Sequence, residues 1–149
     1  MSHSYSCNRY HIIFSTKHRV KSIPKEHRED LWAFIGGIAR QKGMKAIAVG
    51  GVADHCHLLL IVPPSMPVAK GVQVIKSFSS KWCNQKFGRG KFAWQEGYAS
   101  ISVSTSLVES TVKYILNQEQ HHRRKTFEEE FVEFLKKNEI EYDPKFVYG

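Results

Sequence analysis

Two histidines, His55 and His57, stand one residue apart at the start of the apolar segment HCHLLLIV. Side chains two residues apart on a β-strand point to the same face, and the strand rises about 3.3 Å per residue. The two imidazoles are therefore neighbours able to bind one cation, whereas Cys56 points to the opposite face as a small buried side chain. Two hydrogen-bonded histidines at the edge of a core are the alternative interpretation. Because two ligands do not make a metal site, a third must come from another element.

Tyr114 and Gln118 stand one helical turn apart in a later segment and offer a candidate third ligand. A Ser-x-x-Glu capping box, formed by Ser106 and Glu109, predicts where this helix begins. Its apolar face is predicted to consist of Val108, Val112, Ile115 and Leu116. At 100° per residue, Tyr114 lies about 100° beyond the edge of this face, and Gln118 lies about 40° from Tyr114. An ordinary half-exposed surface tyrosine is the alternative interpretation.

The elements that must position these residues follow the order β-α-β-β-α-β, with two helices after the last strand. β-Branched and aromatic residues predict strands, and apolar residues at helical spacing predict helices. The predicted strands cover residues 9–16, 45–53, a segment that ends at Val62, and 98–104. The predicted helices run from Pro24 to Gly43, from Pro67 to Phe87, from Ser106, and from Thr126, which forms a capping box with Glu129. The tail over residues 140–149 is predicted to be irregular.

This order is that of the α+β ferredoxin-like (RRM-like) fold, an antiparallel four-stranded sheet with two helices on one face, here followed by additional C-terminal helices. In that topology the first and third strands are central. His55 and His57 are therefore expected on an inner strand of the sheet.

Length and composition fit one domain in a reducing compartment. A chain of 149 residues is long enough to bury a core, and no apolar run approaches the ~20 residues of a membrane span. Three cysteines without a Cys-x-x-Cys pair argue against a disulfide framework or a cysteine zinc site. The N-terminus lacks the apolar core of a signal peptide, so a cytoplasmic location is expected.

The net charge of +8 is unevenly distributed along the chain. Residues 1–126 carry 19 basic and seven acidic side chains, a net charge of +12, whereas residues 127–149 carry −4. A body this basic favours a polyanionic partner, most often nucleic acid, over the alternative of a merely solvated surface. The candidate contacts are Lys17 and Arg19 after the first strand, Lys113 beside Tyr114, and Lys81, which with Trp82 offers charge and stacking. Core packing is the alternative role of Trp82.

Taken together, the His-x-His pair, the Tyr-x-x-x-Gln pair, the strand order and the basic charge resemble one family. It is that of the single-tyrosine HUH transposases of small insertion sequences and their REP-associated relatives, where HUH denotes two histidines around a hydrophobic residue. The stretches that carry the resemblance are YHIIFSTKHR, DHCHLLL, GYASISVSTS and VKYILNQEQHHRRKTFEEE. The resemblance extends from about Arg9 to Leu135, with Cys56 where an aliphatic residue is more usual. It implies a single transposase domain over residues 1–149, with the catalytic core and tyrosine helix over about 9–124 and a C-terminal helix and tail over 126–149.

The resemblance also implies a chemistry. His55, His57 and Gln118 would hold a divalent cation, and Tyr114 would be the nucleophile. The family cleaves single-stranded DNA, forms a 5′-phosphotyrosine, and rejoins strands when the free 3′-hydroxyl attacks another phosphotyrosine. Two imidazoles and an amide oxygen suit Mn²⁺ by ligand type, whereas Mg²⁺ prefers oxygen but is abundant, and Zn²⁺ also binds such ligands.

The expected partners are single-stranded DNA with hairpins, at element ends or repeats, and a second copy of the chain. In such a homodimer Tyr114 acts in the site of its own subunit or in that of its partner, and the sequence leaves both open. Three other functions stay open as well. They are a non-catalytic RRM-like module that binds single-stranded nucleic acid, a metal-dependent nuclease that uses water, and a domesticated relative that acts on chromosomal hairpin repeats.

Overall fold

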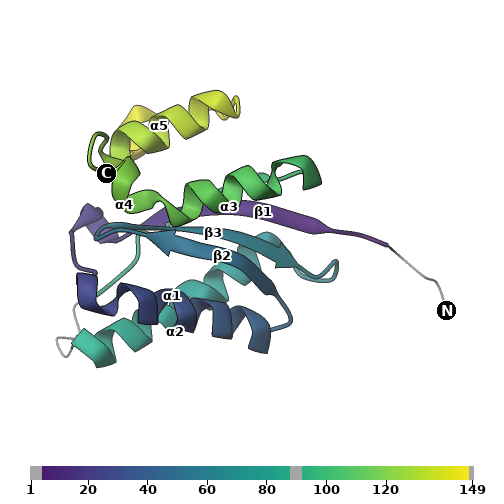
Figure 1. The fold of residues 1–149 in the computed structure, drawn as a ribbon, viewed down its shortest axis with the longest axis horizontal. Coiled ribbons are helices and arrows are strands. Elements are labelled where there is room, and N and C mark those ends of the chain that lie inside the picture. The colour runs from purple at the N-terminus through teal and green to yellow at the C-terminus, as the bar shows by residue number, and fades with distance from the viewer. Residues whose placement is uncertain (1–4, 88–91, 148–149) are drawn as a thin grey trace.

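The computed structural model describes residues 5–87 and 92–147, which form a sheet with a layer of helices on each face (Figure 1). The strands are β1 (Asn8–Ser15), β2 (Lys45–Gly51), β3 (His55–Val62) and β4 (Ala99–Ser102). Helices α1 (Lys25–Gln41) and α2 (Val68–Phe87) cover one face, and α3 (Val108–Leu116), α4 (Gln118–His121) and α5 (Phe127–Lys137) lie over the other. Shorter elements are η1 (Lys17–Arg19), η2 (Thr105–Leu107) and α6 (Pro144–Val147). Within the described ranges, no helix is long and apolar enough to cross a membrane.

The sheet has the strand order β2-β3-β1-β4, and every pair of neighbours is antiparallel. β1 and β3 are the inner strands, as predicted, and their register places Ser15 opposite His55 and Ile13 opposite His57. The helix order and the sheet order together are those of the ferredoxin-like fold. The predicted α+β fold class is therefore confirmed.

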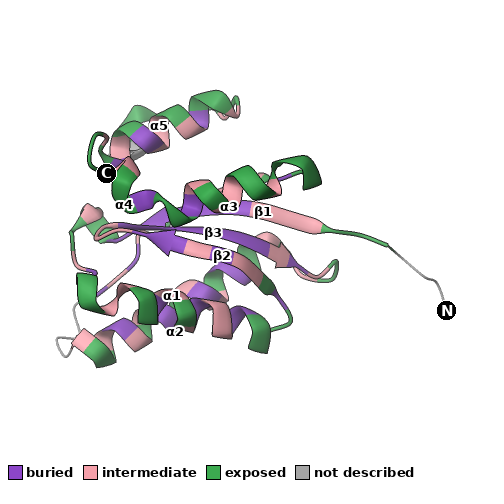
Figure 2. Ribbon diagram, in the orientation of Figure 1, coloured by how far each residue is buried: buried purple, intermediate pink, exposed green. Residues whose placement is uncertain are grey.

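The two faces of the sheet have different cores. The main core lies between the sheet and helices α1 and α2, where Phe14, Cys56 and Leu58 are completely buried. A smaller core on the other face consists of Ala48, Leu59, Val103 and Ile115. Burial is highest along the inner strands and falls off toward the outer surface of α5 (Figure 2). Because strand side chains alternate between faces, His55 and His57 point toward the smaller core and the helices above it.

The predicted third helix differs from the observed one at both ends. It begins with the turn η2, in which the Ser106 hydroxyl lies 3.1 Å from the Ser104 hydroxyl, so the predicted capping box with Glu109 does not form. It also breaks at Asn117, whose φ of −105° and ψ of 24° separate α3 from α4. Leu116, the last residue of α3, is 66 % exposed, so the prediction from helical spacing that it packs in the core is wrong. The break turns Gln118 toward the sheet, where its side chain is buried.

The C-terminal region begins as predicted. The Thr126 hydroxyl accepts a hydrogen bond from the Glu129 backbone N–H, and the Glu129 carboxylate lies near the Thr126 backbone N–H, which completes the capping box. α5 therefore starts at Phe127, and its buried residues are Phe127, Glu130 and Leu135. The tail is irregular except for the single turn of α6, which corrects the prediction of an entirely irregular segment. Residues 148–149 of that tail lie outside the described residues.

Gly50 on β2 lets α3 pack closely on the sheet. A Cβ atom at this position would overlap the Ile115 carbonyl oxygen and would lie 3.3 Å from the Ile115 side chain. A backbone oxygen in a helix moves only if the helix moves, so we expect Gly50→Ala to destabilise the protein by about 1–3 kcal/mol. The midpoint and slope of urea unfolding measure this loss.

Gly37→Ala in α1 is the matched control, because no described heavy atom lies within 4 Å of a Cβ at Gly37. An alanine in a helix interior is expected to raise stability by roughly 0.5–1 kcal/mol relative to glycine. Equal effects of the two substitutions would contradict close packing of α3 at Gly50.

Candidate active site

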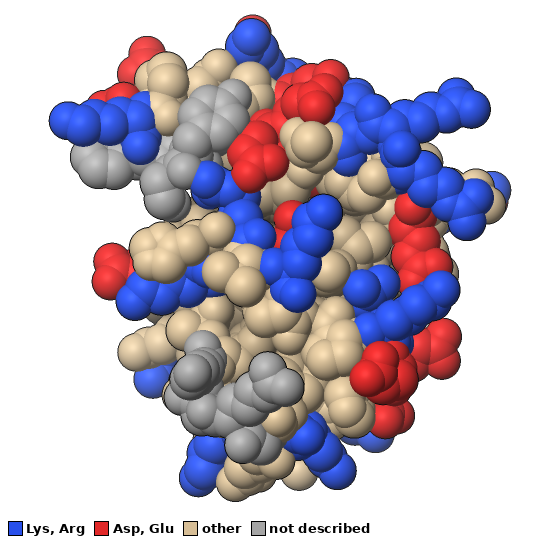
Figure 3. Space-filling view, turned by 90° about the vertical axis from the view of Figure 1, so that its left-hand side faces the viewer, with Lys and Arg blue, Asp and Glu red and all other residues tan. Residues whose placement is uncertain are grey.

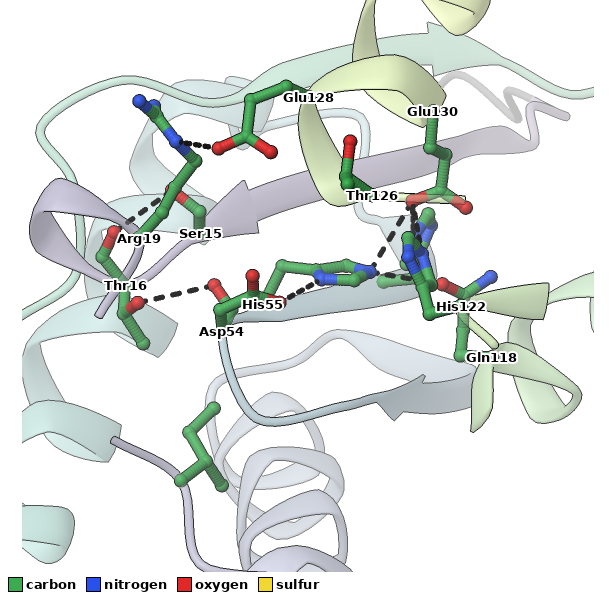
Figure 4. Close-up of polar contacts among 12 residues, drawn as sticks. Ser15, Thr16, Arg19, Asp54, His55, Gln118, His122, Thr126, Glu128 and Glu130 are labelled. Atoms are coloured by element: carbon green, nitrogen blue, oxygen red, sulfur yellow. Dashed lines mark hydrogen bonds and ion pairs between the residues drawn. The ribbon is translucent and has the colours of Figure 1, made fainter. Parts of the chain in front are cut away.

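The first histidine, His55, is held from both sides of its ring (Figure 4). Its Nδ1 lies 2.8 Å from the Asp54 carboxylate, and its Nε2 lies 3.0 Å from Gln118 Oε1 and 3.3 Å from Glu130 Oε1. The ring is completely buried. Burial opposes a charge on the ring, but the hydrogen bonds to Asp54 and Glu130 outweigh it and raise the pKa of His55 to about 9.

The second histidine, His57, is also completely buried on the same strand. Its Nδ1 lies 2.9 Å from His11 Nε2, and its Nε2 lies 3.1 Å from Glu130 Oε1. Burial lowers the pKa of His57 to about 4, although the hydrogen bond to Glu130 acts in the opposite direction. His11 on β1 is 5 % exposed, and burial lowers its pKa to about 3. Both rings are therefore neutral near pH 7, which is the form that binds a metal ion.

Cys56 points to the opposite face of β3, as predicted. Its side chain is completely buried in the main core, and burial raises the pKa of its thiol well above the ordinary value. It therefore acts as a small apolar residue and takes no part in the cluster around His55 and His57.

Tyr114 lies in α3 with its ring toward the histidines of the sheet. Its ring centroid is 5.6 Å from that of His57 and 6.0 Å from that of His11. The hydroxyl donates a hydrogen bond to Glu130 Oε2 and lies 3.4 Å from His121 Nε2. Burial and the negative charge of Glu130 raise the pKa of Tyr114 above its ordinary value. A pocket of about 410 Å³ between α3 and α5 reaches this side chain.

Gln118 contacts both the helix that carries Tyr114 and the candidate metal ligand His55. Its Oε1 atom faces His55, and its Nε2 donates a hydrogen bond of 3.2 Å to the Tyr114 carbonyl oxygen. The side-chain amide is thereby oriented with its oxygen toward the imidazole. The structure thus brings together all four residues for which the sequence predicts catalysis or metal binding, namely Tyr114, His55, His57 and Gln118.

Glu130 and His122 also belong to this cluster, although they are not among the residues predicted from the sequence. His122 Nε2 lies 3.0 Å from Glu130 Oε1, and its Nδ1 lies 2.7 Å from the Lys125 carbonyl oxygen. Burial favours the neutral carboxyl of Glu130, but hydrogen bonds from His122, His55 and His57 hold its pKa well below its usual range. A signal for Glu130 is present in the sequence, because an acidic residue stands on the apolar face of α5, three residues after Phe127.

Among the described residues, one group of His, Cys, Asp or Glu has ligand atoms that all lie within 4.8 Å of one another and is able to hold a metal ion. It consists of His55, His122 and Glu130. His55 belongs to the predicted ligand set, whereas the other two come from the loop after α4 and from α5. Gln118 adds an amide oxygen beside His55, and His57 contacts the same Glu130 oxygen.

The four predicted nucleic-acid contacts occupy different surroundings. Arg19 forms an ion pair with Glu128 of α5 and lines a groove beside the site. Lys17 is exposed in η1 next to it, and Lys113 is exposed and pairs with Glu109 at 3.3 Å. Lys81 is on α2, which covers the other face of the sheet, so the structure does not bring it to the site.

The groove beside the site has a volume of about 700 Å³, and its lining holds seven Lys and Arg residues against four acidic ones, namely Asp54, Glu119, Glu128 and Glu129. Its Lys and Arg residues are Arg19, Lys21, Lys25, Arg28, Arg123, Arg124 and Lys125. Asp54 and His122 also line it, so this basic groove reaches the residues that hold His55 and Glu130. Lys and Arg side chains are numerous on the face of the molecule shown in Figure 3, with acidic side chains among them.

The fold and the site together indicate a transposase, and comparison with known proteins agrees with this class. Residues 4–118 match the model of a family described as "Transposase IS200 like". The chain therefore belongs to the IS200-like transposase family, as the resemblance of its motifs predicts.

Individual relatives support the same family. The transposase for insertion sequence element IS200 of Salmonella typhimurium is 27 % identical over 120 residues, which cover 75 % of this chain and 79 % of the relative. The ISDra2 transposase TnpA of Deinococcus radiodurans is 28 % identical over 116 residues, which cover 73 % and 82 %.

Solved structures share the fold. A crystal structure of a Deinococcus radiodurans protein described as a transposase superimposes with a TM-score of 0.64 at 26 % identity, over 79 % of this chain and 96 % of that one. A REP-associated tyrosine transposase bound to a REP hairpin superimposes with a TM-score of 0.55 at 16 % identity, over 77 % and 68 %. The second likeness shows the fold alone.

Proposed function

We propose that this transposase cleaves and rejoins single-stranded DNA through a 5′-phosphotyrosine on Tyr114, with a divalent cation held by His55, His57 and Gln118. One observation carries the proposal. Glu130 contacts His57 through Oε1 and the Tyr114 hydroxyl through Oε2. A single carboxylate therefore bridges the hydroxyl and the imidazole. A nucleophile and candidate metal ligands that share one carboxylate are close enough to act on the same phosphate.

The residues of the cluster suit a metal ion because their donor atoms are already oriented. Asp54 accepts a hydrogen bond from His55 Nδ1–H, which leaves Nε2 facing the Gln118 oxygen. A carboxylate behind a metal-binding histidine fixes the ring and raises its basicity. When bound, the cation supplies positive charge that stabilises the charge developing on a phosphate. Imidazole and oxygen donors together favour Mn²⁺, and Mg²⁺ is the other candidate.

Tyr114 supplies the attacking oxygen in this proposal. Its hydrogen bond to Glu130 Oε2 holds the hydroxyl proton on the side of α5, so the oxygen lone pairs remain available to phosphorus. Attack forms the Tyr114 O–P bond and breaks the P–O3′ bond. The hydroxyl proton passes to Glu130 Oε2 and O3′ takes up a proton from solvent, so the DNA strand keeps a free 3′-hydroxyl. Because the phosphate stays esterified throughout, rejoining needs no nucleotide cofactor.

The non-catalytic RRM-like alternative is disfavoured by the helices above the sheet. Such modules stack bases on exposed aromatic residues of the inner strands. Here α3, α4 and α5 lie over the corresponding face, and its His11, His55 and His57 are buried. The basic groove instead offers a path for phosphates beside the site. We propose hairpin-containing single-stranded DNA as the partner and expect Lys17 and Arg19 to contact it.

A covalent product tests the proposed function directly. Labelled single-stranded hairpin DNA is incubated with the protein and Mn²⁺ or Mg²⁺, and the products are separated on a denaturing gel. A band of protein-linked DNA is the expected result. Cleaved DNA without that band would instead identify a nuclease that uses water.

We further propose a homodimer in which Tyr114 acts in the site of its own subunit, since its ring lies beside the His57 of the same chain. A mixture of the Tyr114→Phe chain and the His57→Ala chain should then cleave no more DNA than either variant cleaves alone. Restored cleavage would show that the tyrosine acts across the interface. Sedimentation of the free and the DNA-bound protein measures the dimer itself.

A further inference from the structure

The family match ends at Gln118, but the cluster around His55 does not. Glu130 lies 12 residues beyond the match, on α5, and is 3 % exposed. Its Oε1 atom is surrounded by three imidazole nitrogens, at 3.0 Å from His122 Nε2, 3.1 Å from His57 Nε2 and 3.3 Å from His55 Nε2. A single carboxylate oxygen with three nitrogen neighbours needs a physical explanation, because an oxygen has two lone pairs.

The outer hydrogen bonds show which nitrogens carry protons. His55 Nδ1 faces the Asp54 carboxylate and His122 Nδ1 faces the Lys125 carbonyl oxygen, and both of these partners only accept hydrogen bonds. Each Nδ1 therefore carries a proton, which leaves each Nε2 directed at the Glu130 carboxylate. Without a metal ion these Nε2 atoms donate hydrogen bonds to Glu130, and a cation bound among them would replace those protons and take the Nε2 lone pairs.

The spacing of these atoms is that of ligands around one cation. With metal–ligand bonds of about 2.0–2.2 Å, neighbouring ligand atoms are separated by roughly 3 Å or slightly more. Glu130 Oε1 lies 3.0–3.3 Å from each of its three nitrogen neighbours, and the ligand atoms of His55, His122 and Glu130 all lie within 4.8 Å of one another. Gln118 Oε1 lies at a similar distance, 3.0 Å, from His55 Nε2.

We propose that Glu130 and His122 are ligands of the same divalent cation as His55, His57 and Gln118, so that α5 is part of the metal centre. The inference rests on the proposed function for the existence of that cation. Three imidazoles, one carboxylate and one amide oxygen favour Mn²⁺ or Zn²⁺ over Mg²⁺, which prefers oxygen donors and water. It follows that metal binding fastens α5 to the sheet and stabilises the C-terminal region.

Calorimetric titration of the metal-stripped full chain with Mn²⁺ tests this role. Removing a ligand should cost at least the factor of about 10 to 100 that outer-shell changes typically cost, so Glu130→Gln and His122→Ala should each weaken Mn²⁺ binding to that extent or more. Glu133→Gln is the matched control. It is the same change on the same helix, and the Glu133 carboxylate pairs with Lys125 rather than with a histidine. We expect its Mn²⁺ affinity to equal that of the parent chain.

Thermal unfolding with and without Mn²⁺ gives a second readout, since a ligand that binds the folded state raises the melting temperature. We expect this rise in the parent chain and in Glu133→Gln, but a much smaller rise in Glu130→Gln and His122→Ala. If Glu130→Gln does not fold, His122→Ala decides by itself.

Three outcomes separate this inference from the proposed function. In the first outcome, His57→Ala loses Mn²⁺ binding whereas Glu130→Gln and His122→Ala keep it. Glu130 and His122 are then not ligands, but the metal site of the proposed function stands. If Glu130→Gln binds Mn²⁺ more tightly than the parent, the carboxylate competes with the cation and the inference is overturned. If none of the three variants changes Mn²⁺ affinity, the metal site itself is wrong.

Discussion

Replacing Tyr114 by Phe is expected to abolish DNA cleavage and the covalent protein–DNA adduct while DNA binding persists. The substitution removes one oxygen and keeps the ring, which lies edge-on to His57 and His11. Loss of a nucleophile should lower the cleavage rate by roughly 10⁴-fold or more. Binding should change little, because phosphate contacts from basic side chains dominate affinity for DNA.

The fold should tolerate this change. Glu130 loses the Tyr114 hydroxyl but keeps its contacts with His55, His57 and His122, so we expect a stability change of only about 1 kcal/mol. Tyr98→Phe is the matched control. Tyr98 packs against the main core on the other face of the sheet, so its hydroxyl is remote from the site.

The adduct band and peptide mapping of the linked residue decide the assignment. Tyr98→Phe should form the adduct at the parental level, and the DNA should map to Tyr114. DNA linked to a different tyrosine would keep the mechanism but refute Tyr114. Continued cleavage by Tyr114→Phe without an adduct would point to water as the nucleophile.

Replacing His57 by Ala is expected to abolish metal binding and cleavage together. His57 is completely buried on an inner strand and shares Glu130 with His55 and His122. Alanine removes the imidazole from the cluster, and no neighbouring donor on a rigid strand is able to move into its place. We expect Mn²⁺ affinity to fall by about 100-fold or more.

The same change should leave the fold intact at lower stability. It removes a hydrogen-bond partner from His11 and from Glu130, which costs on the order of 1–3 kcal/mol for buried groups. The main core on the other face of the sheet is unaffected. His27→Ala is the control, because His27 lies in α1 and contacts Phe87 away from the site. Undiminished Mn²⁺ affinity in His57→Ala, measured by calorimetry, would contradict the metal site.

Local patterns were sufficient to predict the sheet and its histidines. The alternation of side chains along a strand places His55 and His57 on one face and Cys56 on the other, whatever the rest of the chain does. The order of strands and helices then makes β3 an inner strand. The capping box of Thr126 and Glu129 also depends only on neighbouring residues, and it forms as predicted.

Helical spacing alone was not sufficient for the tyrosine segment. A spacing of 100° per residue places Leu116 on the apolar face, but that face buries only its Ile115 side, and Leu116 is 66 % exposed. The helix also breaks at Asn117, which the spacing does not predict. The break accompanies the burial of Gln118. The side-chain amide of Gln118 forms hydrogen bonds with the Tyr114 carbonyl oxygen and with His55. A contact with a strand 63 residues away is not visible in local periodicity.

The sequence by itself determined the fold class and the shared face of His55 and His57, because each depends on residues close together in the chain. Only the tertiary structure decided that Glu130 meets His57, a residue 73 positions earlier. That contact depends on where α5 packs above the sheet, and the periodicity of α5 shows only which of its faces is buried. The physical reason is that a helix pattern carries no information about which strand the buried face will meet.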